Sequence, residues 1–209
     1  MDKAMNKFYV LSNWITKLFY LQCLWLVGTL AGGVILGLVP STISLYASIR
    51  QLYLGEMDLK LATYFIDYYK NTFKDSIVIG SLYTIAFIIV FSYLQFINAT
   101  SDSSIAYLHI LLYIAMIILF LIMMYIIPVY THYDVKLIAI IKNGFFISLI
   151  NIKYNIYLLS SLLAFFLILS RYQIIIVFFG ISLPGFLNVF FCMKAFEYYE
   201  EKRTQYVNS

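Results

Sequence analysis

The side chains that could bind a metal ion stand close together at one point of the chain. His132 and Asp134 are two positions apart and could supply two metal ligands. Protein zinc sites use three or four side-chain ligands, and the sequence offers no third candidate beside this pair. The pair borders an apolar run, where it can contact lipid headgroups. We therefore expect no metal here, and no cofactor elsewhere.

Charged groups that could move a proton or an ion are missing from the long apolar stretches. Asp, Glu, Lys, Arg and His are all absent from 76–101, 110–131, 155–170 and 172–193. Such side chains inside a membrane mark proton relays and ion paths. His109 comes closest, one turn inside the end of its stretch, where headgroup contact is the simpler role. This pattern disfavours a pump or a proton-coupled carrier.

Motifs of catalysis are also missing. The sequence has no phosphate-binding glycine-rich loop ending in Lys-Ser or Lys-Thr, no His-Glu-x-x-His and no Gly-x-Ser-x-Gly. Hydroxyl groups inside the apolar stretches suit hydrogen bonding between helices better than nucleophilic attack. They belong to Ser81, Tyr83, Ser92, Ser160 and Ser161. We expect a protein that is not an enzyme.

The composition requires lipid as the solvent for much of this chain. Hydrophobic residues make up 63% of it and charged residues 11%, whereas a soluble domain carries about 25% charged residues. An uncharged run of about 20 residues can cross the ~30 Å hydrocarbon core as a helix. The basic residues are spread over several loops, which argues against nucleic acid as a partner.

These runs predict an all-α integral membrane protein. We expect a single domain, a polytopic bundle of six transmembrane helices with additional cytoplasmic amphipathic helices. The spans are expected at about 14–33, 40–55, 77–97, 105–127, 154–170 and 172–193, the second of them short. Three prolines are expected to break helices: Pro40 begins the second span, Pro128 ends the fourth and Pro184 kinks the last. The alternative is five helices, with a single span in place of the first two.

The distribution of positive charge favours six spans. With both termini in the cytoplasm, 13 of the 14 Lys and Arg residues lie on the cytoplasmic side, and Arg171 lies outside. With five spans, Lys3, Lys7 and Lys17 move outside and the number falls to 10 of 14. The richness in Ile, Tyr, Phe and Asn is typical of an AT-rich bacterial genome. We expect a multi-pass protein of the bacterial cytoplasmic membrane. The apolar pattern continues past Gly33, which favours an uncleaved first span over a signal peptide.

Two segments on the cytoplasmic side show more pattern than a loop requires. In 57–75, apolar and aromatic residues recur on one helical face: Leu61, Tyr64, Phe65, Tyr68 and Thr72. This pattern is typical of a helix at the membrane surface, either a plain connector or a docking surface for a partner. The segment 132–153 is expected to form a second such helix, which bends at Gly144 into the following span.

Four glycines lie near the middle of the N-terminal apolar stretch. Gly28 and Gly32 are four residues apart, and so are Gly33 and Gly37. Small residues at this spacing allow two helix backbones to approach closely in a membrane. We expect these glycines to pack helices together.

Four short motifs occur in order along the chain. They are the stretch from Trp25 through Gly37 and Pro40 to Ala47 with Arg50 and Gly55, the stretch Tyr64-Phe65-x-x-Tyr68-Tyr69-Lys70-Asn71-x-Phe73-Lys74, the triplet Lys142-Asn143-Gly144, and Leu183-Pro184 followed by Glu200-Glu201. In this order and spacing they resemble the YesL-type family of small membrane proteins from Gram-positive bacteria, a domain of unknown function. The resemblance covers nearly the whole chain.

This resemblance implies a non-catalytic accessory subunit of an ABC-type carbohydrate or oligosaccharide importer. Its partners would be the permease subunits and, indirectly, the ATPase and the sugar-binding protein, with membrane lipid around them. The residues expected at the partner interface are Arg50, Phe65, Asn71, Phe73, Lys142 and Asn143. Arg50 and Lys142 can instead snorkel to headgroups, and the asparagines can cap helices. The alternative function is a stand-alone carrier or channel for a small solute, which needs a polar pathway between helices.

Overall fold

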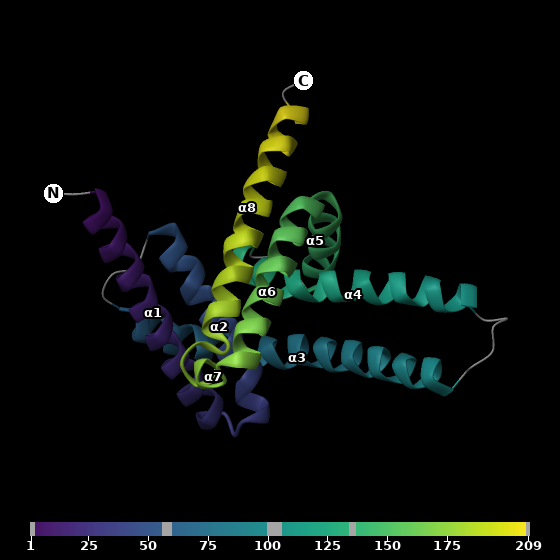
Figure 1. The fold of residues 1–209 in the computed structure, drawn as a ribbon, viewed down its shortest axis with the longest axis horizontal. Helices are drawn as coiled ribbons and strands as arrows, with labels where there is room; N and C mark the ends of the chain where they lie inside the picture. The colour runs from purple at the N-terminus through teal and green to yellow at the C-terminus, as the bar shows by residue number, and fades with distance from the viewer. Residues whose placement is uncertain (1–2, 56–59, 100–105, 134–136, 208–209) are drawn as a thin grey trace.

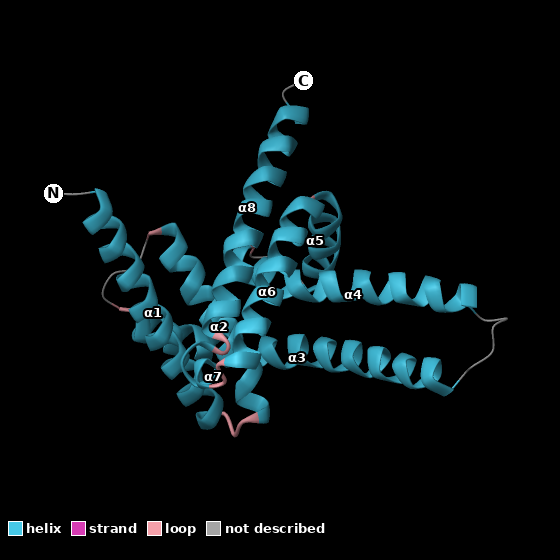
Figure 2. Ribbon diagram, in the orientation of Figure 1, coloured by secondary structure: helices cyan, strands magenta, loops and turns pink. Residues whose placement is uncertain are grey.

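The chain folds into helices. A computed structural model describes residues 3–55, 60–99, 106–133 and 137–207, and these residues include no strand (Figures 1 and 2). The helices are α1 (Lys3–Ala31), α2 (Ile35–Leu54), α3 (Leu61–Ala99), α4 (Ala106–His132), α5 (Leu137–Ile150), α6 (Ile152–Arg171), α7 (Ile174–Phe179) and α8 (Ser182–Val207).

Four of these helices are long and apolar enough to cross a membrane. The segments concerned are Phe8–Ala31, Leu61–Phe96, Tyr113–His132 and Ile152–Arg171. The prediction of an all-α membrane bundle is confirmed. The prediction of six crossings stays a prediction, because α2 and α8 do not meet the same criterion of length and hydropathy.

Helix α2 forms the centre of the bundle and packs against α1, α3, α4 and α8 (Figure 1). It follows α1 after a tight turn in which Gly33 and Val34 have positive φ angles of 75° and 65°. One face of α2 carries Ser41, Ser44 and Ser48, all fully buried. The hydroxyls of Ser44 and Ser48 donate to carbonyls of α2 itself. These small side chains allow other helices to pack closely against α2, and two of the three hydroxyls are occupied within the helix.

Helices α3 and α4 leave the bundle as an antiparallel pair (Figure 1). We call residues 84–99 and 106–121 the arm. The α3 side of the arm exposes large apolar side chains, namely Ile85, Phe87, Ile88, Ile89 and Phe91. The rest of the chain does not cover these side chains, so lipid or another protein must.

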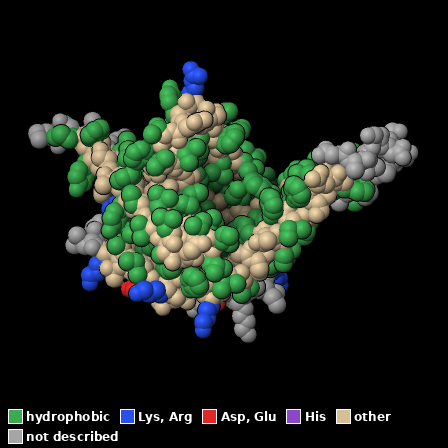
Figure 3. Space-filling view, turned by 90° about the horizontal axis from the view of Figure 1, so that it is seen from below, with side chains coloured by type: hydrophobic (Ala, Val, Ile, Leu, Met, Phe, Trp, Pro, Cys, Tyr) green, Lys and Arg blue, Asp and Glu red, His purple; other side chains and the backbone are tan. Residues whose placement is uncertain are grey.

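Charged and apolar side chains separate on the surface. Seen from below, apolar side chains spread across the face, while Lys and Arg stand at its margins (Figure 3). The charged side chains of Asp67, Lys70 and Lys74 are exposed on the N-terminal half of α3. A bilayer imposes this separation, because a charged group has a high free energy within the hydrocarbon core and a favourable one at the interface.

Helix α3 corrects the prediction of a separate surface helix over 57–75. It runs unbroken for 39 residues, from Leu61 to Ala99, through the boundary expected before the span 77–97. Ser76 stands at that boundary, and its hydroxyl donates to the Thr72 carbonyl over 2.7 Å without interrupting the helix. The N-terminal half of α3 packs onto α1 and α2, because its aromatic face finds protein there rather than lipid headgroups.

A hydrogen bond places this half of α3 beside the turn between α1 and α2. The Tyr69 hydroxyl donates to the Gly28 carbonyl over 3.1 Å, close to the end of α1. The six-span prediction puts this turn outside and residues 57–75 in the cytoplasm, and this assignment of sides stays a prediction.

Two of the three prolines lie inside helices instead of at their ends. Pro40 lies within α2, which already begins at Ile35, directly after the tight turn. Pro128 lies within α4, which continues to His132. A proline inside a helix leaves the carbonyl four residues earlier without its N–H donor. For Pro128, a side chain from α8 takes the place of that donor.

The apolar run 172–193 forms two helices instead of one kinked helix. Helix α7 ends at Phe179 and α8 begins at Ser182. Pro184 lies in the first turn of α8, where a missing N–H removes no helical bond. The break therefore comes before Pro184, and the kink predicted at that proline is wrong.

The segment 132–153 contains α5, which passes through Gly144 without the predicted bend. The chain breaks instead at Asn151, between α5 and α6. The Asn151 side chain donates to the carbonyl of Ile147 over 3.1 Å and to that of Ala195 in α8 over 3.2 Å. An asparagine that bonds nearby carbonyls competes with the helical ladder, which explains the position of the break.

Candidate functional site

The start of α8 is held by a glutamine from α1. The Gln22 Oε1 atom accepts hydrogen bonds from the backbone N–H groups of Ile181, over 3.2 Å, and Ser182, over 2.9 Å. The first N–H groups of a helix have no partner within the helix and need an acceptor from elsewhere. Gln22 is itself buried, at 3% exposure. A buried amide thus caps a helix that begins within the apolar bundle.

Side chains from α3 and α8 support the interior proline of α4. Pro128 cannot donate to the Met124 carbonyl, and the Asn188 Nδ2 atom donates to that carbonyl over 3.2 Å. The Tyr83 hydroxyl donates to the neighbouring Met123 carbonyl over 2.7 Å. Asn188 is 2% exposed. The proline is thus compatible with a continuous α4, because side chains from α3 and α8 donate to the carbonyls of Met123 and Met124.

Arg50, predicted at the partner interface, is engaged within the chain. Its Nε atom donates to the Nδ1 atom of His132 over 3.3 Å. The His132 ring stacks on Phe196 of α8, with centroids 4.8 Å apart. Nearby, the Tyr53 hydroxyl donates to the Glu197 carboxylate over 3.4 Å. These contacts join the C-terminal ends of α2 and α4 to α8.

The three predicted interface residues on α3 lie in different surroundings. Phe65 is 2% exposed and belongs to the main core, so its prediction as a partner-facing residue is corrected. Its side chain packs beside Gly28, where an added Cβ atom would lie 3.4 Å from the Phe65 ring. Phe73 is half-buried and pairs with Tyr69, with ring centroids 5.7 Å apart. Asn71 is exposed and stays available to a partner.

Lys142 and Asn143 lie on α5, which packs against α4, α6 and α8. Lys142 is exposed and Asn143 is half-buried. The six predicted interface residues are therefore distributed over α2, α3 and α5, and one of them is in the core. The structure does not gather them into one site.

Three of the four predicted packing glycines lie where helices approach closely. A Cβ atom on Gly28 would meet the Ser41 hydroxyl at 2.7 Å, and one on Gly37 would meet the Thr29 carbonyl at 2.5 Å. A Cβ on Gly32 would collide with the backbone of Gly37. Gly33 differs, since it has open space around it and a φ angle of 75°. Its role is the turn, where a positive φ favours glycine.

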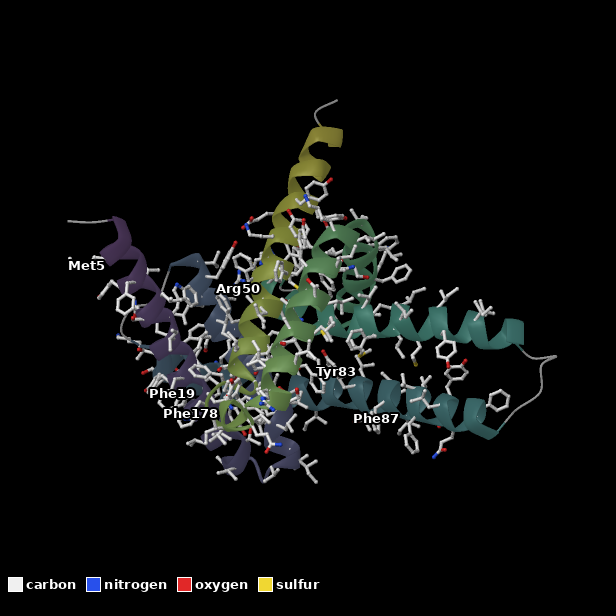
Figure 4. The ribbon with its side chains drawn as sticks, in the orientation of Figure 1. Met5, Phe19, Arg50, Tyr83, Phe87 and Phe178 are labelled. Atoms are coloured by element: carbon white, nitrogen blue, oxygen red, sulfur yellow. The ribbon has the colours of Figure 1, made fainter. Side chains whose placement is uncertain are left out.

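A cavity of about 820 Å³ lies at the base of the arm, between α3 and α4 and against α2, α6 and α8. Tyr83 and Phe87, one turn apart on α3 (Figure 4), line it together with Ala86. Its polar lining residues are Thr42, Tyr46, Tyr83 and Asn188, and the remaining described residues of the wall are aliphatic, aromatic or methionine. The described wall contains no charged side chain.

No group of three or more His, Cys, Asp or Glu residues in the described part of the chain could hold a metal ion. The Nδ1 atom of His132 accepts the hydrogen bond from Arg50. Asp134, the second residue of the candidate pair, lies outside the described residues.

Sequence reasoning missed Gln22 and Asn188. Each is an uncharged amide inside a long apolar stretch. This position in the sequence is the signal that could have identified them as hydrogen-bonding residues. A buried amide requires hydrogen-bond partners, and in a membrane bundle those partners come mostly from other helices. The pattern indicates that such an amide is hydrogen-bonded, but which group it bonds depends on the tertiary fold.

Comparison with known proteins gives relatives along most of the chain. Residues 18–93 match the family described as "Protein of unknown function, DUF624". Uncharacterized protein YesL of Bacillus subtilis (strain 168) is 24% identical over 191 residues, which cover 91% of this chain and 90% of the relative. Uncharacterized protein YteU of the same organism is 27% identical, covering 90% and 84%. Uncharacterized protein YesV is 28% identical, covering 91% and 92%.

No solved structure matches the chain. The DUF624 match contains α2, the start of the α3 arm, and the glycines that bring α1 and α2 together. The three relatives extend the similarity to α8. The resemblance inferred from the sequence motifs is confirmed: residues 18–93 are similar to the DUF624 family, and most of the chain is similar to YesL, YteU and YesV.

Proposed function

We propose that this protein is a non-catalytic membrane subunit of an ABC-type carbohydrate importer, and that it packs against the permease subunits through the outer face of the arm. The proposal combines the family resemblance with one structural observation. The arm is the outer part of two apolar helices, α3 and α4, and the chain's own bundle leaves its large apolar side chains largely uncovered.

The outer face of the arm is distinct from the face that lines the cavity. On α3, the cavity is lined by residues at helical spacing, such as Tyr83, Ala86 and Val90. Ile85 and Ile88 do not line it, and each is 55% exposed. Aliphatic side chains on a rigid helix can pack closely against the helices of another membrane protein.

The interior of the bundle supports a binding role more than a transport role. Ser44 and Ser48 donate to their own helix, and Gln22 and Asn188 are occupied by backbone groups of α8 and α4. A carrier of a hydrophilic solute needs free polar groups along its path. The hydrogen-bonding groups named here are instead used within α2, in the case of the two serines, or between helices, in the case of Gln22 and Asn188.

Photo-crosslinking can test the assembly. The chain would be co-expressed with the permease pair of a carbohydrate ABC importer from the same organism, with a photoreactive phenylalanine analogue at Ile88. Phe166 on α6, which is also apolar and exposed (66%), provides the matched control position. We expect a covalent adduct with a permease subunit from position 88 and a much weaker one from position 166.

Purification tests the same proposal independently. Affinity capture of this chain in a mild detergent should retain the permease pair. If the permease pair purifies without this chain and position 88 gives only lipid adducts, the proposal fails.

A further inference from the structure

We propose that the cavity at the base of the arm holds one acyl chain of a membrane glycerolipid. The cavity lies between two contacts that tie α3 to α4. At its base, the Tyr83 hydroxyl bonds the Met123 carbonyl, and further out the rings of Tyr93 and Tyr113 meet edge to face at 6.1 Å. Between these contacts the helices are separated, and the space amounts to about 820 Å³.

The chemistry of the wall selects an apolar occupant. Tyr83 and Asn188 direct their polar groups to carbonyls of α4, and the Thr42 hydroxyl donates to the Leu38 carbonyl. Tyr46 is left as the one polar lining residue without a described hydrogen bond. A sugar or an ion would lose its hydration in this space and gain almost no hydrogen bond in return. A hydrocarbon chain has no hydration to lose on entry.

The size of the cavity distinguishes an acyl chain from a partner helix. A helix 10–12 Å across occupies on the order of 500 Å³ per turn. The cavity of about 820 Å³ would therefore hold less than two turns, whereas a helix that crosses the membrane has five or six turns. The volume instead falls within the range of about 300–1,000 Å³ that is usual for small-molecule sites.

The walls lead directly to the surface that faces lipid. Phe87, Ile117 and Phe120 line the cavity and are also 68%, 56% and 47% exposed. An acyl chain can thus enter sideways from the bilayer while its headgroup stays outside the cavity. Met116, Met123 and Met124 line the wall, and methionine adapts its shape to a flexible apolar ligand.

The labelling test uses the purified full-length chain alone, and the permease is added only in a final control. The protein would be reconstituted in phosphatidylcholine vesicles with phosphatidylglycerol as the minor lipid. A small fraction of phosphatidylcholine would carry a diazirine on one acyl chain, and photolabelled residues would be mapped by mass spectrometry. We expect labelling to concentrate on the cavity walls in α3 and α4.

Two matched substitutions on α3 give the decisive comparison. Ala86→Trp fills the cavity, because Ala86 lines it and is 7% exposed. Ile88→Trp adds the same side chain two residues away on the outer face. We expect wall labelling to be lost in A86W and kept in I88W. Val90→Trp repeats the test if A86W does not fold.

Three outcomes would overturn the assignment. Labelling that is spread evenly over exposed faces and unchanged in A86W would mean ordinary contact with bulk lipid. Loss of wall labelling in Tyr46→Phe, which removes only a hydroxyl, would mean a polar ligand. Displacement of the label by added permease, with a permease helix crosslinked at Phe120, would mean that a partner helix occupies the cavity.

Discussion

Asn188 in α8 donates a hydrogen bond to the Met124 carbonyl of α4, the carbonyl for which Pro128 provides no donor. Asn188 and Met124 are 64 positions apart in the sequence. A local feature of α4 is thus completed by a helix that is synthesised much later. This dependence can be measured.

Asn188→Leu should lower the free energy of unfolding by about 1–2 kcal/mol, because a buried carbonyl loses its partner. In a Pro128→Ala background the backbone N–H at position 128 can bond the Met124 carbonyl. The Asn188→Leu substitution should then be milder by about 1 kcal/mol. Steric trapping or titration with sodium dodecyl sulfate, followed by circular dichroism, gives the four stabilities. Strictly additive losses would show that the amide does not replace the missing donor.

Gln22→Leu should destabilise the protein by about 1–2 kcal/mol, since two N–H groups at the start of α8 lose their acceptor. Hydrogen exchange by mass spectrometry should show faster exchange at residues 181 and 182 than in the parent protein. Gln173→Leu is the control, because Gln173 is exposed and makes no capping bond from its side chain. Equal behaviour of the two variants would argue against the cap.

Replacing each of three glycines with alanine should change the stability by three different amounts. Gly32→Ala forces the α1 and α2 backbones apart and should cost about 3 kcal/mol, the upper end of the range that is typical of overpacked sites. Gly33→Ala meets open space but keeps a φ of 75°, for a cost of about 1 kcal/mol. Gly144→Ala makes only an ordinary contact with Tyr125 at 3.5 Å and should be neutral or stabilising by up to ~1 kcal/mol. Any other ranking in detergent unfolding would contradict these local geometries.

The variants Phe65→Ala and Asn71→Ala distinguish an effect on folding from an effect on assembly with the permease. Phe65 is buried in the core, so its truncation should lower stability by about 3 kcal/mol. Asn71 is exposed on the same helix, so its truncation should leave the unfolding curve within about 0.5 kcal/mol of the parent. If Asn71 contributes to the partner surface, capture of the permease falls while the unfolding curve does not move. A change in stability for N71A, or none for F65A, would contradict the burial of these side chains.

The helical nature of the chain could be predicted because it follows from charge and hydropathy. The uncharged run 76–101 lies almost entirely in α3, and 110–131 lies in α4. The ends of the helices were harder to predict. Proline rules place a helix end at Pro128, but the chain continues to His132 because Asn188 and Tyr83 arrive from elsewhere.

Predictions of the site failed for a related reason. Phe65 and Asn71 share one amphipathic pattern, and only the packing of α1 and α2 decides which of them is covered. The hydrogen bond from Tyr69 to Gly28 could not be predicted either, because counts of positive charge assign loops to sides of the membrane and do not show which helices pack together. Periodicity identifies a face of a helix, whereas tertiary packing identifies its neighbour.

The unbroken length of α3 has a mechanical consequence. Its 39 residues form a rod of about 58 Å at the usual rise per residue. One end carries the exposed Asp67, Lys70 and Lys74, and the other forms half of the arm. With no hinge between them, a tilt imposed on the arm within the bilayer must also swing the charged end. Helix α2, which packs against α3, is the support across which such a tilt would be transmitted.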